Sequence, residues 1–295
     1  MITRGALVDP VMASAPAGLW RDALRRLRRN RLAMIGVACM TLFFAAAILA
    51  PVIAPYAAND MGGPSLSGPS AAHLFGTDLL GRDVFSRVLY GAQISLFVGV
   101  FAVVLALIIG MTFGAIAGGY GGRVDGIIMR ATDVLLSIPT ILLAIGIVTW
   151  LGQGLPQLVL AIAVGYAPVF ARLLRGSLLA LREADYVIAA RTIGGSSARI
   201  LLRHMLPNAL TPLIVQATLV LATAIIDIAG LGFLGLGPAD PRTPEWGTML
   251  VDARRFMQTA PHIVFFIGGA IVISAIGFNL LGDGLRESLD PKLKR

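Results

Sequence analysis

One charge-free stretch, Val134–Ala171, determines how often this chain can cross a membrane: VLLSIPTILLAIGIVTWLGQGLPQLVLAIAVGYAPVFA. A single helix of these 38 residues would be about 57 Å long, at about 1.5 Å per residue. The hydrocarbon core of a bilayer is only about 30 Å thick, so the stretch must turn back on itself. The segment GQGLP at Gly152–Pro156 has the glycine and proline content of a turn. The sequence therefore predicts two spans here, joined at that segment.

The overall composition also indicates a membrane protein. Of the 295 residues, 57% are hydrophobic and 14% are charged, and the mean hydropathy is +0.82. A typical soluble domain has about a quarter of its residues charged. We therefore expect an all-α membrane protein with six transmembrane helices. The predicted spans cover residues about 32–56, 94–118, 134–151, 155–174, 209–235 and 262–282.

The basic residues predict the orientation of these spans. With the N- and C-termini in the cytoplasm, 19 of the 24 Lys and Arg residues lie on the cytoplasmic side. Five spans would instead place the Arg-rich segment 172–208 outside, against the positive-inside tendency. The net charge of +8 therefore reports topology and gives no reason to expect a nucleic-acid partner.

The predicted layout has two parts. Residues 1–31 form a basic cytoplasmic segment, and residues 32–295 form the transmembrane domain. A cleaved signal peptide is the alternative for the N-terminus, but the apolar run is longer than the roughly 7–15 residues of a typical signal core. That length favours a retained first helix. Residues 57–93 are predicted as an external loop. The segment 82–95, which leads from this loop into the second span, forms either an interfacial helix or an extension of that span.

The sequence lacks the motifs of several enzyme classes. An ATP-binding P-loop requires a lysine, and the only lysines are Lys292 and Lys294 in the C-terminal tail. Neither H-E-x-x-H nor G-x-S-x-G occurs. The segment GLGFLG at Gly230–Gly235 matches a dinucleotide-binding pattern, but such a site requires a preceding strand, and here a span precedes it. These glycines instead predict close helix packing or an irregular exit from the bilayer.

Metal and disulfide chemistry is also not predicted. Cys39 is the single cysteine and lies within an apolar run, so no intramolecular disulfide can form. The three histidines are widely separated in the sequence and do not suggest a metal site.

A basic segment, YVIAARTIGGSSARILLRHMLPN at Tyr186–Asn208, interrupts the apolar pattern on the predicted cytoplasmic side. A helix over 183–193 can end at Gly194-Gly195, because glycine adopts the left-handed conformation without steric cost. Ser196 or Ser197 can cap a second short helix over 198–205, and Pro207 suits the first turn of the next span. Such a pair of helices is typical of a docking element for a cytoplasmic protein, whereas a solvated loop explains only the charge.

At this segment the sequence resembles the permease subunits of ABC importers, whose cytoplasmic loop motif runs E-A-A-x3-G-x9-I-x-L-P. Ala189, Ala190, Gly194 and the pair Leu206-Pro207 fall in frame, whereas Ile188 and His204 replace the motif's Glu and Ile. These departures are similar to the dipeptide/oligopeptide/nickel branch, as are three further segments. The segments that resemble its C-type permease are HLFGTDLLGRDVFSRVLYGAQISL (73–96), LGFLGLGPADPRTPEWGTML (231–250) and FNLLGDGLRESLDPKLK (278–294).

The resemblance implies a fold, partners and a mechanism. The fold would be that of type I ABC importer permeases, and the loop at about 176–208 would hold the coupling helix, seated on an ATPase subunit. The partners would be a homologous B-type permease, two ATP-binding subunits and an extracytoplasmic solute-binding protein. ATP and Mg would bind to the partner subunits, with no cofactor on this chain. The residues implied in coupling are Ala189, Ala190, Arg191, Gly194, Gly195, Arg199 and Pro207.

Two further groups of polar residues have open interpretations. Asp227 lies late in the fifth span, where it lines a translocation path or bonds to a neighbouring helix; Gln216, on the same span, could serve either purpose. In the external loop, Asp78, Arg82 and Asp83 receive the binding protein or form a local salt-bridged turn.

Other functional classes fit the sequence less well. A secondary transporter would not need a coupling loop, and a membrane enzyme would need a nucleophile–base pair that the sequence does not suggest. Within the importer interpretation, the lack of a His/Cys cluster favours a di- or oligopeptide over a metal complex.

Overall fold

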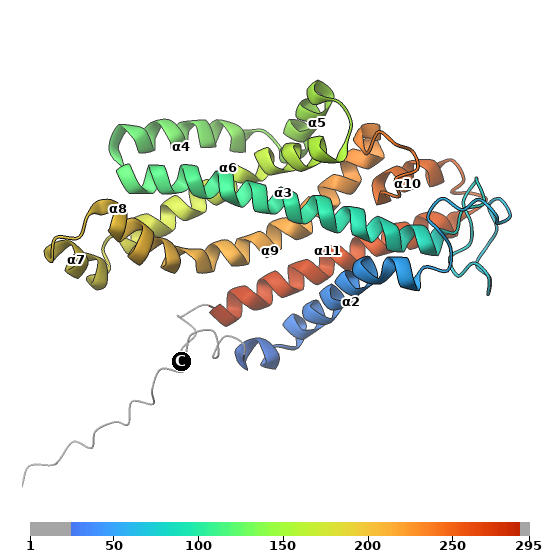
Figure 1. Cartoon of the computed structure of the whole chain (residues 1–295), viewed down its shortest axis with the longest axis horizontal. Helices are drawn as coiled ribbons and strands as arrows, with labels where there is room; N and C mark the ends of the chain where they lie inside the picture. Colours follow the sequence, from blue (N-terminus) through green and yellow to red (C-terminus); the bar gives the residue numbers. More distant parts are fainter. Residues whose placement is uncertain (1–24, 290–295) are drawn as a thin grey trace, which may run out of the picture.

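The computed structural model describes residues 25–289, and every regular element in that part of the chain is helical (Figure 1). The predicted all-α class is therefore confirmed. Most of the predicted basic segment 1–31 lies outside the described residues. The elements are α2 (Arg31–Ile53), α3 (Val84–Tyr120), α4 (Gly122–Ser137), α5 (Thr140–Leu151), α6 (Leu155–Leu181), α7 (Asp185–Thr192), α8 (Ser197–Ile200), the π-helical η1 (Leu201–Met205), α9 (Leu206–Leu231), the π-helical η2 (Gly232–Leu236), α10 (Trp246–Arg254) and α11 (Pro261–Leu289).

Within residues 25–289, five helical segments are long and apolar enough to cross a membrane. They are α2, α3, α6, α11 and the continuous segment from α8 through η2, Ser197–Leu236. In Figure 1 these helices run roughly along the long axis of the molecule. The loop before α3, predicted to be external, lies at one end of this bundle, and α7 and α8 lie at the other (Figure 1).

The third predicted span, 134–151, is wrong as a single helix. Residues 134–137 complete α4, and α5 follows after a bend of 92°. The helix breaks at Ile138 because the ring of Pro139 disfavours a helical conformation in the preceding residue. By itself α5 is about 18 Å long at about 1.5 Å per residue, too short to cross about 30 Å of hydrocarbon. Only α4 and α5 together, as one bent span, give a sixth crossing.

The second span is longer than predicted. Helix α3 has 37 residues and begins at Val84, so residues 84–93 are helical and do not belong to the external loop. The carboxylate of Asp83 caps this helix by accepting a hydrogen bond from the Ser86 amide at 2.7 Å. The start of α3 is thus an extension of the span, and a separate interfacial helix is excluded. Helix α6 continues to Leu181, so the first residues of the predicted coupling loop, 176–208, belong to this helix.

A row of glycines brings α3 and α6 into close contact. Gly110, Gly114 and Gly118 recur every four residues along α3, so they lie on one face of the helix. A Cβ atom added at Gly110 would lie 2.5 Å from both the Ala167 carbonyl oxygen and the Phe170 Cβ on α6. Small residues permit such close backbone approach between helices in a bilayer. The two helices form the centre of the larger apolar core, together with α9.

Replacing Gly110 by Leu should therefore destabilise the bundle, because the added side chain has no space against α6. Overpacking of this kind costs about 1–3 kcal/mol or more. We expect a lower Tm and less folded protein in detergent, measured by fluorescence-detected size-exclusion chromatography. Gly146→Leu in α5 is the matched control, since no atom lies within 4 Å of a Cβ added there. Equal losses from the two variants would contradict the packing described.

The segment after α9 confirms the expectation of an irregular helix end at GLGFLG. Gly235 has φ of 80° within η2, and Gly232 packs against the side chain of Glu245. Glu245 caps α10 by accepting hydrogen bonds from the amides of Gly247 and Thr248 at 2.7 and 2.8 Å. Burial raises the pKa of Glu245 to about 7, although these two hydrogen bonds oppose the shift. Helix α9, and not a strand, leads directly into GLGFLG, so this part of the fold does not provide the setting of a dinucleotide site.

Candidate coupling site

Helix α7 is held against its own chain by its inward side. Val187 and Ala190 are buried in the larger core, together with Ile200 at the end of α8. Because apolar contacts join the two helices, a force on α7 passes to the segment that continues into α9. Ala190 is only 9% exposed. Ala190, one of the residues implied in coupling, therefore packs against its own chain and supports α7 from behind.

The end of α7 has the hydrogen bonds of a Schellman motif. The Gly195 amide donates to the Ala190 carbonyl at 3.0 Å, and the Gly194 amide donates to the Arg191 carbonyl at 2.9 Å. Gly194 has φ of 83°, the left-handed conformation predicted from the sequence. A Cβ at Gly195 would lie 2.7 Å from the Ala190 carbonyl oxygen. Position 194 thus requires glycine because of its backbone conformation, and position 195 requires glycine because of its close contact with the Ala190 carbonyl.

The outward side of α7 is apolar and basic. Ile193 is 87% exposed, and Ile188 and Ala189 are also exposed. Helix α7 ends at Thr192, so Ile193 does not extend the buried side formed by Val187 and Ala190 and instead projects outward. Exposed apolar side chains that cluster on a surface outside the bilayer commonly mark a protein contact.

The predicted coupling residues include two arginines, Arg191 on α7 and Arg199 on α8. Arg191 and Arg199 are exposed, and neither forms an ion pair with another residue of the described chain. Their guanidinium groups are thus free to meet acidic or carbonyl groups of another protein.

The second predicted short helix does not stand alone. It begins at Ser197, passes through the π-helical turn η1 and continues without interruption into α9. Pro207 lies in the first turn of α9, as predicted, and has no amide hydrogen to donate. The nearby Asn208 side chain donates to the His204 carbonyl at 2.7 Å. Ser196 occupies the N-cap position of α8, but its side chain makes no capping hydrogen bond.

Ion pairs brace the bundle beside this site. The Arg175 guanidinium donates to both carboxylate oxygens of Asp125, at 3.0 and 2.6 Å, and Arg172 pairs with Asp133. These pairs join α6 to α4, and Arg182 donates to the Gly119 carbonyl of α3 at 2.8 Å. From the sequence, these arginines predict only the orientation of the spans. Their partners lie 39, 50 and 63 positions away on separate helices, so no local pattern identifies the pairs.

The residues predicted for the translocation path lie on α9. Asp227 is half-buried and accepts a hydrogen bond from the Tyr166 hydroxyl of α6 at 2.7 Å. Gln216 is half-buried about three turns away on the same helix, and its side chain makes no hydrogen bond within the described part of the chain. Bonding to a neighbouring helix, one of the two interpretations of Asp227, is thus present, and it leaves the carboxylate accessible.

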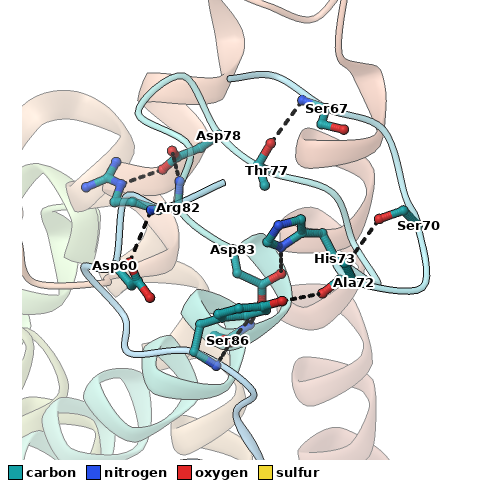
Figure 2. A network of polar contacts seen from close by, with 12 residues as sticks. Asp60, Ser67, Ser70, Ala72, His73, Thr77, Asp78, Arg82, Asp83 and Ser86 are labelled. Atoms are coloured by element: carbon teal, nitrogen blue, oxygen red, sulfur yellow. Dashed lines mark hydrogen bonds and ion pairs between the residues drawn. The ribbon is translucent and has the colours of Figure 1, made fainter. Parts of the chain in front are cut away.

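The three external residues, Asp78, Arg82 and Asp83, lie inside a folded loop at the opposite end of the molecule (Figure 2). Asp83 is buried and accepts hydrogen bonds from Ser86 and from His73, the latter at 3.0 Å. Asp78 accepts from the Arg82 guanidinium at 2.6 Å. The local salt-bridged turn, one of the two interpretations of these residues, is present in the structure.

These features define a class of protein: a helical membrane protein with an apolar, basic helix projecting from one end of its bundle. The fold is similar to that of a solved inward-facing methionine ABC transporter, MetNI, with a TM-score of 0.58 and 21% identity. The match covers 69% of this chain and 96% of that chain, and at this identity it shows the fold alone.

The sequence matches establish the family. Residues 110–295 match the model for the binding-protein-dependent transport system inner membrane component, and residues 18–69 match the N-terminal TM domain of oligopeptide transport permease C. The chain belongs to this family of multi-pass inner membrane permeases. A dipeptide transport permease, DppC of Alkalihalophilus pseudofirmus, is 50% identical over 93% of this chain and 90% of its own length. A glutathione transport permease, GsiD of Escherichia coli, is 48% identical over 98% of this chain and 94% of its own length.

Proposed function

We propose that this chain is the C-type permease of an ATP-driven importer for di- or oligopeptides, and that α7 couples it to ATP hydrolysis. In this assembly a homologous B-type permease forms the other half of the pathway, and two cytoplasmic subunits bind ATP and Mg. An extracytoplasmic binding protein delivers the substrate. The N- and C-termini and α7 face the cytoplasm. This chain supplies no catalytic group.

The observation that carries the coupling proposal is the two-sided construction of α7. Its outward side presents Ile188 and Ile193, whereas its inward side is fixed to α8 through buried contacts. A partner that moves α7 therefore moves the start of the long α8–α9 segment. ATP can drive alternating access only if ATP binding favours one state of the permease over another. A rigid helix that contacts both the partner and the span provides that link.

The substrate class is supported by the two relatives, whose names refer to a dipeptide and to glutathione. No group of three or more His, Cys, Asp or Glu suited to a metal ion occurs within residues 25–289. We place Asp227 and Gln216 on the translocation path, with the Asp227 carboxylate available to the ammonium group of a passing peptide.

Reconstitution into proteoliposomes tests this function. We expect this chain alone to transport nothing, and the complex of both permeases, both ATP-binding subunits and the binding protein to accumulate a labelled di- or tripeptide only when ATP is supplied. Peptide uptake by this chain alone, or ATP-independent uptake by the complex, would contradict the proposal.

A further inference from the structure

The external end of the molecule contains a charged cavity that the proposed function does not yet use. Its volume is about 230 Å³, and it lies between the loop before α3, the helix α10 and the first turns of α11. A water molecule occupies about 30 Å³ of the liquid, so the cavity has room for a whole side chain with several waters. Exposed Leu79 and Leu80 belong to its lining.

Arg82 lies in the wall of this cavity in a fixed position. It is only 6% exposed, and its Nε donates to the Asp78 carboxylate at 2.6 Å (Figure 2). The other Asp78 oxygen accepts from the backbone amides of Arg82 and Leu80, at 3.0 and 2.9 Å. The Asp78 carboxylate is therefore fully engaged in holding the loop and the base of the Arg82 guanidinium.

A second buried arginine shares the wall. Arg87 is 2% exposed, and its Nη1 donates to the Ala58 carbonyl at 2.9 Å and to the Asn59 side chain at 3.3 Å. The Nε of Arg87 is 3.9 Å from Asp78, beyond hydrogen-bond distance. Arg87 is thus anchored at one nitrogen.

Several guanidinium nitrogens of the two arginines have no partner in the described chain. Both Nη atoms of Arg82 and the Nη2 of Arg87 make no hydrogen bond to another described residue. The fully enclosed side-chain atoms without a partner in the described chain are Gln157 Oε1 and His262 Nε2, and no arginine nitrogen is among them. These donors are therefore not fully enclosed by protein, and the cavity is a space that both arginines line.

The charges around the cavity do not cancel. Arg82, Arg87 and Arg255 line it, against Asp78 and Asp252. Asp83 contributes nothing, because it is buried on the other side of the loop with His73 and Ser86 (Figure 2). Buried arginines need an acceptor for their free donors, and the planar guanidinium matches a carboxylate with two parallel hydrogen bonds. The cavity thus fits an anionic, carboxylate-bearing ligand.

We infer that this cavity receives an acidic side chain of the solute-binding protein, and that Arg82 is its main contact. The inference rests on the proposed function, which places a binding protein on this side of the membrane. A family of binding-protein-dependent systems requires a docking surface there. Leu79 and Leu80 supply apolar area at the rim, which can exclude water from the charged contact. The three polar residues of this loop therefore have separate functions: Arg82 contacts the binding protein, Asp78 positions Arg82, and Asp83 caps α3.

Two substitutions of opposite expected effect test this inference. In the complete importer in nanodiscs, Arg82→Gln should weaken the affinity for its purified binding protein by about tenfold or more, because a buried charged contact is lost. Asp252→Asn removes an exposed carboxylate from the cavity lining and should tighten binding by about twofold to fivefold, the size expected for an exposed charge. Arg242→Gln, which removes an exposed arginine of the external segment before α10, is the matched control and should leave the affinity unchanged.

The combination separates docking from general damage. A merely structural effect would weaken binding in the Arg82 variant and leave the exposed Asp252 variant at the unmodified affinity, and that result would overturn the inference. Unchanged affinity in both variants, or loss of a bound anionic lipid from Arg82→Gln without a change in affinity, would also overturn it. In those cases, ATP-dependent peptide uptake by the unmodified importer would leave the proposed function intact.

Discussion

An importer that carries Gly194→Trp is expected to assemble and hydrolyse ATP while losing most of its peptide uptake. Gly194 has φ of 83°, a conformation that costs a residue with a Cβ about 1–2 kcal/mol. No atom lies within 4 Å of a Cβ added at this position, so the tryptophan fits spatially but strains the turn. A cost of that size changes an equilibrium by about 5- to 30-fold. We therefore expect the amount of peptide taken up per ATP hydrolysed to decrease by the same factor.

The control for this variant is Gly122→Trp. Gly122 has φ of 58°, and no atom lies within 4 Å of a Cβ added there either, so the backbone strain is comparable. Gly122 begins α4 and is not part of the coupling loop. Uptake and ATP hydrolysis, measured together in proteoliposomes, should remain in the unmodified ratio for Gly122→Trp. Tight coupling in the Gly194 variant, or equal uncoupling in both, would contradict the proposed function of this turn.

Replacing Asp227 by Asn is expected to reduce the maximal rate of peptide uptake by about 10- to 100-fold. The substitution removes the negative charge of the Asp227 carboxylate, which we propose binds the ammonium group of the peptide. A hydrogen bond to a charged group contributes about 1.5–3 kcal/mol. About 1.4 kcal/mol corresponds to a tenfold change in rate. The carbonyl oxygen of asparagine can still accept from the Tyr166 hydroxyl, which lies 2.7 Å from the Asp227 carboxylate.

Tyr166→Phe distinguishes a path residue from a packing residue. It removes the same hydrogen bond but keeps the Asp227 carboxylate. If Asp227 acts on the substrate, Tyr166→Phe should retain most of the uptake measured with labelled peptide. If its purpose is to join α9 to α6, Tyr166→Phe should lose more uptake than Asp227→Asn, which keeps an acceptor for the Tyr166 hydroxyl, and Asp227 would then leave the proposed path.

Local sequence patterns predicted the coupling loop well where backbone chemistry dominates. The left-handed conformation at Gly194 follows from the Gly-Gly pair, and the position of Pro207 in the first turn of α9 follows from its missing amide hydrogen. These features depend on a few neighbouring residues, so a single sequence is sufficient to find them.

Features that depend on tertiary packing were harder to predict. The bend at Ile138 has a local signal in Pro139. The length of the apolar stretch, however, requires only one turn, and the segment at Gly152 already supplies it. The sequence predicts a separate short helix over 198–205. Nothing in these residues indicates that the π-helical turn η1 joins that helix to α9. The pairing of Arg175 with Asp125 joins residues 50 positions apart, so it required the fold.

Contact between α7 and the ATP-binding subunit is the central claim, and site-directed cross-linking measures it most directly. In a Cys39→Ser background, the Ile193→Cys variant should cross-link to the ATP-binding subunit and should resist an impermeant maleimide added outside intact cells. Met61→Cys, in the exposed external loop, should give the opposite pattern. External labelling of the Ile193→Cys variant, or its failure to cross-link in an importer that is active in uptake, would contradict the account.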